Sequence, residues 1–120
     1  MIENQVSRSA FLTAYVRAHH SLHDEPKIFD DFFAHRIIPE DIQTLIEQNL
    51  VSSLQSTDPE RVKFCPDKAS TLAWVIQTVL PSSIMISRAR YAEDSLKLAV
   101  KQGVRQYVIL GAGLDTFAFR

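Results

Sequence analysis

The stretch Gly103-Val-Arg-Gln-Tyr-Val-Ile-Leu-Gly-Ala-Gly-Leu-Asp-Thr-Phe-Ala-Phe-Arg120 decides which fold this sequence predicts. Gly103 suits the left-handed residue that ends a helix, and the apolar run at residues 107–110 has the β-branched and aromatic content of a buried strand. Gly111-Ala-Gly113 indicates a tight turn, after which residues 114–120 resemble the start of another helix. A helix, a strand, a glycine turn and a new helix, in this order, open an α/β sheet that binds a nucleotide-like ligand.

The composition is that of a globular domain with a core of its own, since 46% of the 120 residues are hydrophobic and 22% are charged. A net charge of −1 provides no electrostatic footprint for nucleic acid or for an anionic membrane. Cys65 is the only cysteine, which excludes a disulfide within one chain and favours a cytoplasmic setting. The sequence shows neither a secretory signal nor an apolar run of membrane-spanning length.

Residues 1–103 predict a helical N-terminal cap of about five helices. Asn4 or Ser7 can cap a first helix that runs to about residue 21. A short helix is expected over residues 28–34, where it would bury three aromatic side chains: Phe29, Phe32 and Phe33.

Three longer helices are expected over residues 39–50, 67–80 and 83–102. Pro39 suits the first turn of one of them, and Asp67 can cap the next. Residues 51–67 carry the weakest pattern, apart from one helical turn that Asp58 and the following proline could start. The last helix is expected to bury a stripe made of Met85, Ala89, Ala92, Leu96 and Ala99.

These patterns predict the α/β class, with a Rossmann-like fold truncated after the first strand. Residues 1–103 would form the cap, and residues 104–120 would supply the first strand, the glycine turn and the start of the first helix. One strand cannot form a sheet. The chain itself is therefore expected to be mostly α-helical and to be the N-terminal part of a larger protein.

The glycine turn is the first candidate for a binding site, because glycine lets backbone approach a ligand and tolerates positive φ. The dinucleotide pattern Gly-x-Gly-x-x-Gly would place a third glycine where Thr116 stands. A pyrophosphate is therefore disfavoured, and a cofactor with an adenosine but no phosphate fits better. A tight turn without any ligand is the alternative.

Four sequence blocks add specificity: Ser7-Arg-Ser-Ala10, Arg17-Ala with Pro26-Lys-Ile-Phe-Asp-Asp31, Ser87-Arg-Ala-Arg-Tyr91, and the string from Val104 to Thr116. Together they resemble the leucine carboxyl methyltransferase family, more narrowly its bacterial and archaeal branch of proposed S-adenosylmethionine-dependent O-methyltransferases. The resemblance implies a class I methyltransferase sheet with a helical extension, S-adenosylmethionine as the cofactor and a small carboxylate or hydroxyl acceptor. It also implies that Gly111, Ala112 and Gly113 lie under the methionine moiety, while a cap arginine pairs with its carboxylate.

The sequence departs from that family in two respects. Phe117 stands where many members carry an arginine, and the later motifs, including the acidic residue that binds the ribose, are missing. The 120-residue chain alone is therefore expected to be inactive. Two rival interpretations are an inactive remnant or helical interaction module without cofactor binding, and a Rossmann-type oxidoreductase, which Thr116 disfavours.

Arg88 and Arg90 are the candidates for the cofactor's carboxylate, since a guanidinium can bind a carboxylate through two hydrogen bonds. At about 100° per residue, Arg88 lies roughly 60° from the centre of the buried stripe and Arg90 nearly opposite to it. The sequence thus favours Arg88 as the ligand and places Arg90 against water or a neighbouring segment.

The remaining polar residues are interpreted as structural. His19 and His23 have a metal-binding spacing but no third ligand, so no metal is expected. The neighbouring acids Asp30 and Asp31 are expected to cap a helix locally, as is Asp115. No catalytic residue is assigned, because methyl transfer from a sulfonium needs no protein nucleophile.

Overall fold

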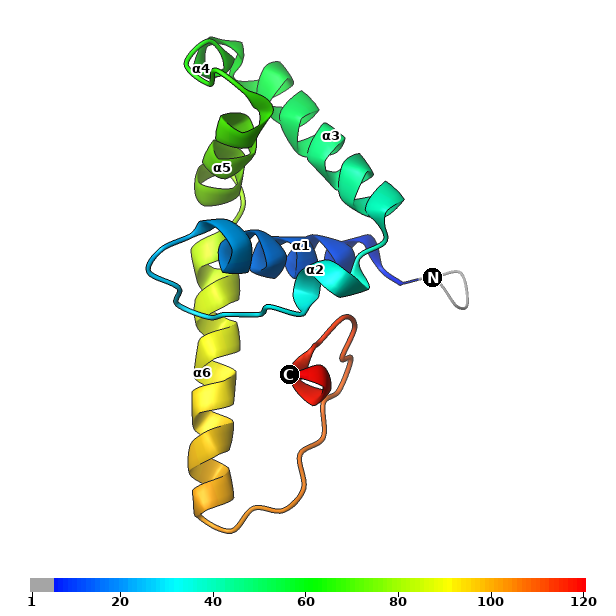
Figure 1. Ribbon diagram of the computed structural model, residues 1–120, viewed down its shortest axis with the longest axis vertical. Coiled ribbons are helices and arrows are strands. Elements are labelled where there is room, and N and C mark those ends of the chain that lie inside the picture. The colour runs from blue at the N-terminus through cyan, green and yellow to red at the C-terminus, as the bar shows by residue number, and fades with distance from the viewer. Residues whose placement is uncertain (1–5) are drawn as a thin grey trace.

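The computed structural model describes residues 6–120, and its regular elements are helical (Figure 1). They are α1 (Arg8–His23), α2 (Ala34–Ile37), α3 (Glu40–Thr57), α4 (Pro59–Val62), α5 (Lys68–Thr78), α6 (Ser82–Lys101) and the 3-10 helix η1 (Phe117–Phe119). The prediction of a mostly α-helical chain is confirmed. Within the described residues no single helix is long and apolar enough to cross a membrane; α5 and α6 meet that test only as a pair bent by 68°.

Side-chain caps start three of the helices as predicted. Ser7 Oγ accepts the Ala10 N–H at 3.1 Å, Asp58 Oδ1 accepts the Arg61 N–H, and Asp67 Oδ1 accepts the Ser70 N–H. Each cap satisfies a backbone donor that the helix itself leaves without a partner. Asn4, the other predicted cap of α1, lies outside the described residues.

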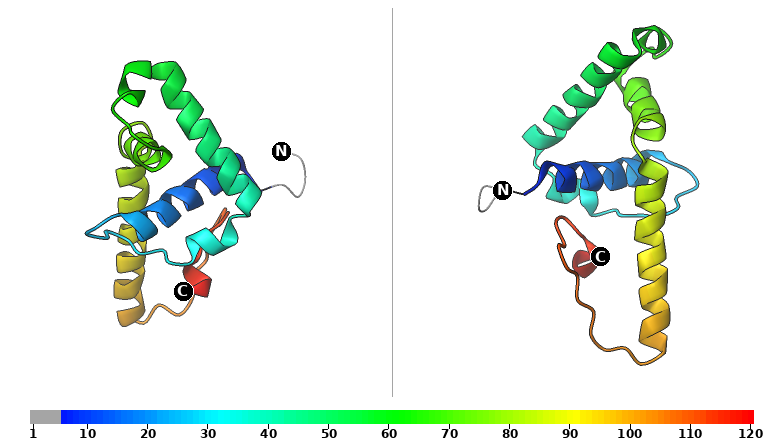
Figure 2. Two further views of the ribbon diagram at one scale, coloured as in Figure 1. Left: turned by 45° about the horizontal axis from the view of Figure 1, so that its top comes forward. Right: turned by 180° about the vertical axis from the view of Figure 1, so that it is seen from behind.

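The main core lies between α1, α3 and α5, which surround it on three sides in Figures 1 and 2. Its buried members are Ala14, Tyr15, Ala18, Ala34, Ile38, Leu50, Leu54, Leu72, Val75 and Ile76. A smaller cluster joins α1 to α6, where Val16, Phe29 and Ile86 are buried together. The face of α1 that lies away from the main core is therefore the one that meets α6 and the C-terminal segment.

The prediction of a helix over residues 28–34 is wrong. Residues 28–33 form bends and a turn, and α2 begins only at Ala34, whose N–H donates to Asp31 Oδ1 at 3.1 Å. Phe29 is buried as expected, whereas Phe32 is 55% exposed. Phe33 is half-buried and stacks on Phe119, with ring centroids 5.6 Å apart.

Two long helices also differ from the prediction. Helix α3 continues past residue 50 to Thr57, because Leu54 extends its buried face by one more turn. In the stripe predicted for α6, Ala92 is exposed and its other four members are half-buried, while Ile86 is the buried residue. The reason is that much of α6 projects beyond the other helices (Figure 1), so its faces have few neighbours to pack against.

The strand predicted over residues 107–110 is not formed in the structure, which contains no strand in residues 6–120. After Gly103, whose φ is +96°, the chain runs back beside α6 toward α1 and α2 (Figure 1). Its backbone has no neighbouring strand to hydrogen-bond with, and Leu110 is 90% exposed. The helix expected after the glycine turn is only the 3-10 helix η1. The domain boundary between residues 103 and 104 stays a prediction.

Candidate functional site

The glycine turn packs against the first half of α1. Gly111 and Gly113 have φ values of +64° and +55°, a region in which residues with a Cβ are strained. A Cβ on Gly113 would lie 3.4 Å from the Cβ of Ala10, whereas a Cβ on Gly111 would meet nothing within 4 Å. Gly113 therefore brings the turn close to α1, and Gly111 keeps open space beside its backbone.

A cavity of about 300 Å³ lies between the turn and α1. Its lining consists of Ser7, Ser9, Ala10, Thr13, Arg17, Gly111, Ala112, Gly113, Leu114 and Asp115. The three predicted turn residues thus share one cavity. The α1 residues Ala10, Thr13 and Arg17 face it together because they are spaced three and four positions apart, on one side of the helix.

Arg88 lies in a second cavity, of about 490 Å³, between α1 and α6. This cavity is lined by Thr13, Arg17, Met85, Arg88, Ala89, Tyr91 and Ala92. Arg88 and the glycine turn therefore do not line one common cavity in the structure. Thr13 and Arg17 belong to both linings, so they form the wall between the two spaces.

Of the arginines of α6 and those of the charge cluster near it, Arg88 is the one without an acidic partner in the described residues. Arg17, Arg90 and Arg120 pair with Asp31, Asp94 and Glu93, respectively. Arg88 is exposed and forms no ion pair with another of residues 6–120.

Arg90 is held by its neighbours, as predicted. Its Nε lies 2.6 Å from Asp94 Oδ2, and one of its terminal nitrogens donates to the Ile28 carbonyl at 3.1 Å. The choice of Arg88 over Arg90 as the ligand of a cofactor carboxylate stays a prediction.

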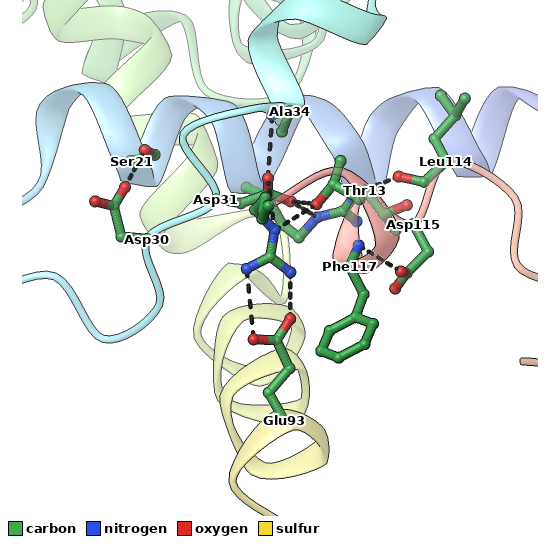
Figure 3. A network of polar contacts seen from close by, with 12 residues as sticks. Thr13, Ser21, Asp30, Asp31, Ala34, Glu93, Leu114, Asp115 and Phe117 are labelled. Carbon is green, nitrogen blue, oxygen red and sulfur yellow. Dashed lines mark hydrogen bonds and ion pairs between the residues drawn. The ribbon is translucent and has the colours of Figure 1, made fainter. Parts of the chain in front are cut away.

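A buried charge cluster joins α1, the loop before α2, α6 and the segment that follows the glycine turn (Figure 3). Asp31 is fully buried and accepts hydrogen bonds on Oδ2 from Arg17 Nε at 2.8 Å and from Thr116 Oγ1 at 2.7 Å. Arg17 also donates to the Leu114 carbonyl at 2.6 Å. Arg120 donates to Thr116 Oγ1, lies 3.4 Å from Asp31 Oδ1 and pairs with Glu93.

The sequence predicted only the contacts that these aspartates make with residues close to them in the chain. Asp31 Oδ1 accepts the Ala34 N–H at the start of α2, although the N-cap residue of that helix is Phe33, and Asp115 Oδ1 accepts the Phe117 N–H at 2.9 Å at the start of η1. Asp30 instead accepts from Ser21 of α1 (Figure 3). The sequence analysis did not predict that Arg17 lines the cavity beside the glycine turn. Its spacing of four and seven residues from Thr13 and Ala10, which places all three on one side of α1, was the signal that could have indicated this role.

The histidines of α1 are packed against one another and against the following loop. The rings of His19 and His23 lie 4.7 Å apart, and burial, followed by the nearby His23, lowers the pKa of His19. His20 Nε2 accepts the Ile28 N–H, so its other nitrogen donates to Asp24 Oδ2 at 2.7 Å. Among residues 6–120 no three His, Cys, Asp or Glu side chains are grouped so that they could hold a metal ion.

Comparison with known proteins assigns the chain to a protein family. The model of the leucine carboxyl methyltransferase family matches residues 10–120. The chain belongs to this family. Its resemblance through the four sequence blocks is thereby confirmed.

The curated relatives carry one description. The chain is 41% identical over 123 residues to YktD of Bacillus subtilis, a match that covers 100% of this chain and 40% of YktD. A Mycolicibacterium smegmatis relative is 32% identical over 122 residues, which cover 99% of this chain and 35% of the relative. Both are named as proposed S-adenosyl-L-methionine-dependent methyltransferases. This chain spans 40% or less of the length of either relative, and no solved structure gives a significant match.

The leucine carboxyl methyltransferase family uses S-adenosylmethionine, and the residues of this site fit the methionine end of that cofactor. The backbone of Gly111 has open space where a Cβ would otherwise stand. Arg88 offers a guanidinium without an ion pair in the described chain, which suits an α-carboxylate. The wall of Thr13 and Arg17 adjoins both features.

Proposed function

We propose that this chain forms the cap and the glycine turn of an S-adenosylmethionine-dependent O-methyltransferase, whose acceptor is a small carboxylate or hydroxyl compound in the cytoplasm. The observation that carries the proposal is the open glycine turn on α1, which shares the wall residues Thr13 and Arg17 with the cavity of Arg88, an arginine without an ion pair among residues 6–120. The class I, Rossmann-like sheet of this proposal begins at residues 107–110 and is completed by sequence that the longer relatives contain.

The proposed roles follow from the chemistry of each group. Arg88 binds the cofactor's carboxylate through its guanidinium, and the backbone of Gly111, Ala112 and Gly113 contacts the methionine moiety. S-adenosylmethionine supplies a methyl group on a positively charged sulfur, which is already activated for displacement. The protein therefore has to hold the cofactor, align the acceptor and exclude water. A carboxylate acceptor is ionised at neutral pH and needs no general base, whereas a hydroxyl acceptor needs one.

A helical interaction module without cofactor binding is the second candidate. The exposed apolar side chains that follow α6 favour it, since Val108 is 73% and Leu110 90% exposed. In the methyltransferase proposal the same residues pair with further strands and become buried.

A chimaera tests the proposal without knowledge of the acceptor. The chain is joined in register to the part of YktD that the match leaves uncovered, and calorimetry measures S-adenosylmethionine binding by the chimaera and by the chain alone. We expect the chimaera to bind and the chain alone to bind far more weakly, because the ribose and adenine contacts are missing from it. A folded chimaera without affinity favours the interaction module.

Arg88→Ala in the chimaera tests the assigned residue. We expect the dissociation constant to rise at least about tenfold, since a charge-assisted pair is lost. Arg90→Ala is the matched control, because Arg90 lies on the same helix but is held by Asp94 and the Ile28 carbonyl. Unchanged affinity in Arg88→Ala would remove this residue from the site.

A further inference from the structure

We propose that Asp31 is a positioning residue for the glycine turn, acting through Arg17 and Thr116. It holds the residues after the turn against α1, so that the turn backbone faces the cavity at a fixed distance from the wall. The consequence for cofactor binding rests on the proposed function; the positioning of the turn does not.

Asp31 joins three separate segments of the chain. It binds Arg17 of α1, accepts the Ala34 N–H at the start of α2, and accepts from Thr116 in the C-terminal segment, 85 residues away in sequence. In Figure 3 these contacts converge on one carboxylate between α1 and the C-terminal segment. A single buried side chain thus joins the C-terminal segment to both α1 and the start of α2.

The anchors lie immediately beside the turn. Arg17 binds the carbonyl of Leu114, the residue that follows Gly113, and Asp31 binds the side chain of Thr116 two positions later. Beside these bonds, Gly113 lies close to Ala10 and Leu114 packs against the main core, but neither contact is a directional polar bond. The two anchors therefore add directional bonds that set the orientation of the turn relative to the cavity wall.

The charges of the cluster are balanced and poorly solvated. Asp31 and Glu93 face Arg17 and Arg120, and the four side chains are at most 19% exposed. Removing one partner of a buried ion pair leaves the other charge without compensation. Arg17 is consequently held by the protein itself and shapes the wall, whereas Arg88 stays available to a ligand.

Thr116 explains why the third glycine of a dinucleotide pattern is absent. Its side chain is 1% exposed, donates to Asp31 and accepts from Arg120 Nε at 2.8 Å. Glycine at this position would have no hydroxyl to make either bond. Thr116, whose presence disfavours a dinucleotide-binding site, is thus also the residue that links the end of the turn to Asp31.

Backbone dynamics of the 120-residue chain test the positioning role. Thr116→Val removes the hydroxyl and keeps the side-chain volume, Thr116→Ser keeps the hydroxyl, and Asp31→Asn removes the charge. We expect NMR order parameters of residues 111–116 to fall from about 0.85 to below about 0.6 in Thr116→Val and Asp31→Asn, with α3 and α5 unchanged. Thr116→Ser should retain the wild-type values.

Two results would overturn the proposal. One is a turn that stays equally ordered in Thr116→Val. The other is loss of order in α3 and α5 to the same extent, which would make Thr116 a general stability residue.

Calorimetry of the chimaera separates this inference from the proposed function. Thr116→Val should raise the dissociation constant for S-adenosylmethionine at least about fivefold, and Thr116→Ser should leave it unchanged. If the wild-type chimaera does not bind, the proposed function fails while the dynamics still decide the role of Asp31. If it binds and Thr116→Val binds equally well, the turn does not need this anchor for cofactor binding.

Discussion

Thr116 Oγ1 donates a hydrogen bond of 2.7 Å to the fully buried carboxylate of Asp31, across 85 residues of sequence. The bond connects the loop before α2 to the segment that follows the glycine turn. Because Arg17 binds the same carboxylate oxygen from α1, three parts of the chain meet at one acid beside the candidate cofactor site. The following predictions test this arrangement and the helical frame around it.

A double-mutant cycle should show that Asp31 and Thr116 are energetically coupled. Asp31→Asn, Thr116→Val and the double variant are unfolded in urea, and the free energies of unfolding are compared. We expect a coupling energy of about 1–3 kcal/mol, as for residues of one buried polar network. Additive losses would show that the two residues contribute independently.

Gly113→Ala should impair the site more than the fold. Its φ of +55° strains an alanine by about 1–2 kcal/mol, and the new Cβ would lie 3.4 Å from Ala10 at the cavity. Gly103→Ala is a matched control, since φ there is +96° but no atom lies within 4 Å and the residue lies at the far end of α6. We expect both variants to lose stability, and only Gly113→Ala to weaken S-adenosylmethionine binding by the chimaera. Equal affinities in the two variants would contradict a ligand at the turn.

Part of the loss of folding stability at acidic pH should come from Glu47. Partial burial raises the pKa of this carboxyl, but hydrogen bonds from Lys68, Gln43 and Tyr15 together lower the pKa below the ordinary value of 4.5. A carboxyl whose pKa is lowered by folding stabilises the fold above its unfolded pKa, and that contribution is lost as the pH falls through the lowered value. Glu47→Gln should therefore have a lower Tm than wild type at pH 7, and the difference should shrink below about pH 4. A difference that is the same at both pH values would exclude this linkage.

The Tyr15 hydroxyl should matter to Glu47 only as a hydrogen-bond donor. Burial, and then the Glu47 charge, raise the pKa of Tyr15, so the hydroxyl stays protonated and donates to Glu47 Oε1 at 3.2 Å. Tyr15→Phe keeps the buried ring and should lower the unfolding free energy by about 0.5–1.5 kcal/mol at pH 7. A loss as large as that of a core truncation would indicate that the hydroxyl has a further role.

Leu54→Ala should destabilise the cap strongly. Leu54 is 1% exposed at the centre of the contact between α3 and α5, and such truncations cost about 2–5 kcal/mol. Leu45→Ala on the same helix is the control, because Leu45 is 52% exposed and should cost well under 1 kcal/mol. Equal losses in urea unfolding would show that the buried face of α3 has been assigned incorrectly.

Interactions within a few residues of each other could be predicted from the sequence. The caps at Ser7, Asp58 and Asp67 each join a side chain to a backbone N–H three residues later, so their chemistry is visible in the order of residues. The four sequence blocks indicated the family. The end of α3 was missed because Leu54 is recognised as buried only once α5 lies against it.

The amino-acid sequence by itself determined the long helices α1, α3, α5 and α6, the glycine turn and the family to which this chain belongs. Only the tertiary structure decided that Arg17 forms the wall between the two cavities, that Asp31 holds Thr116, and that residues 107–110 form no strand here. The physical reason is that a buried ion pair or a strand depends on partners distant in sequence, whereas a cap or a turn carries its partners within a few residues.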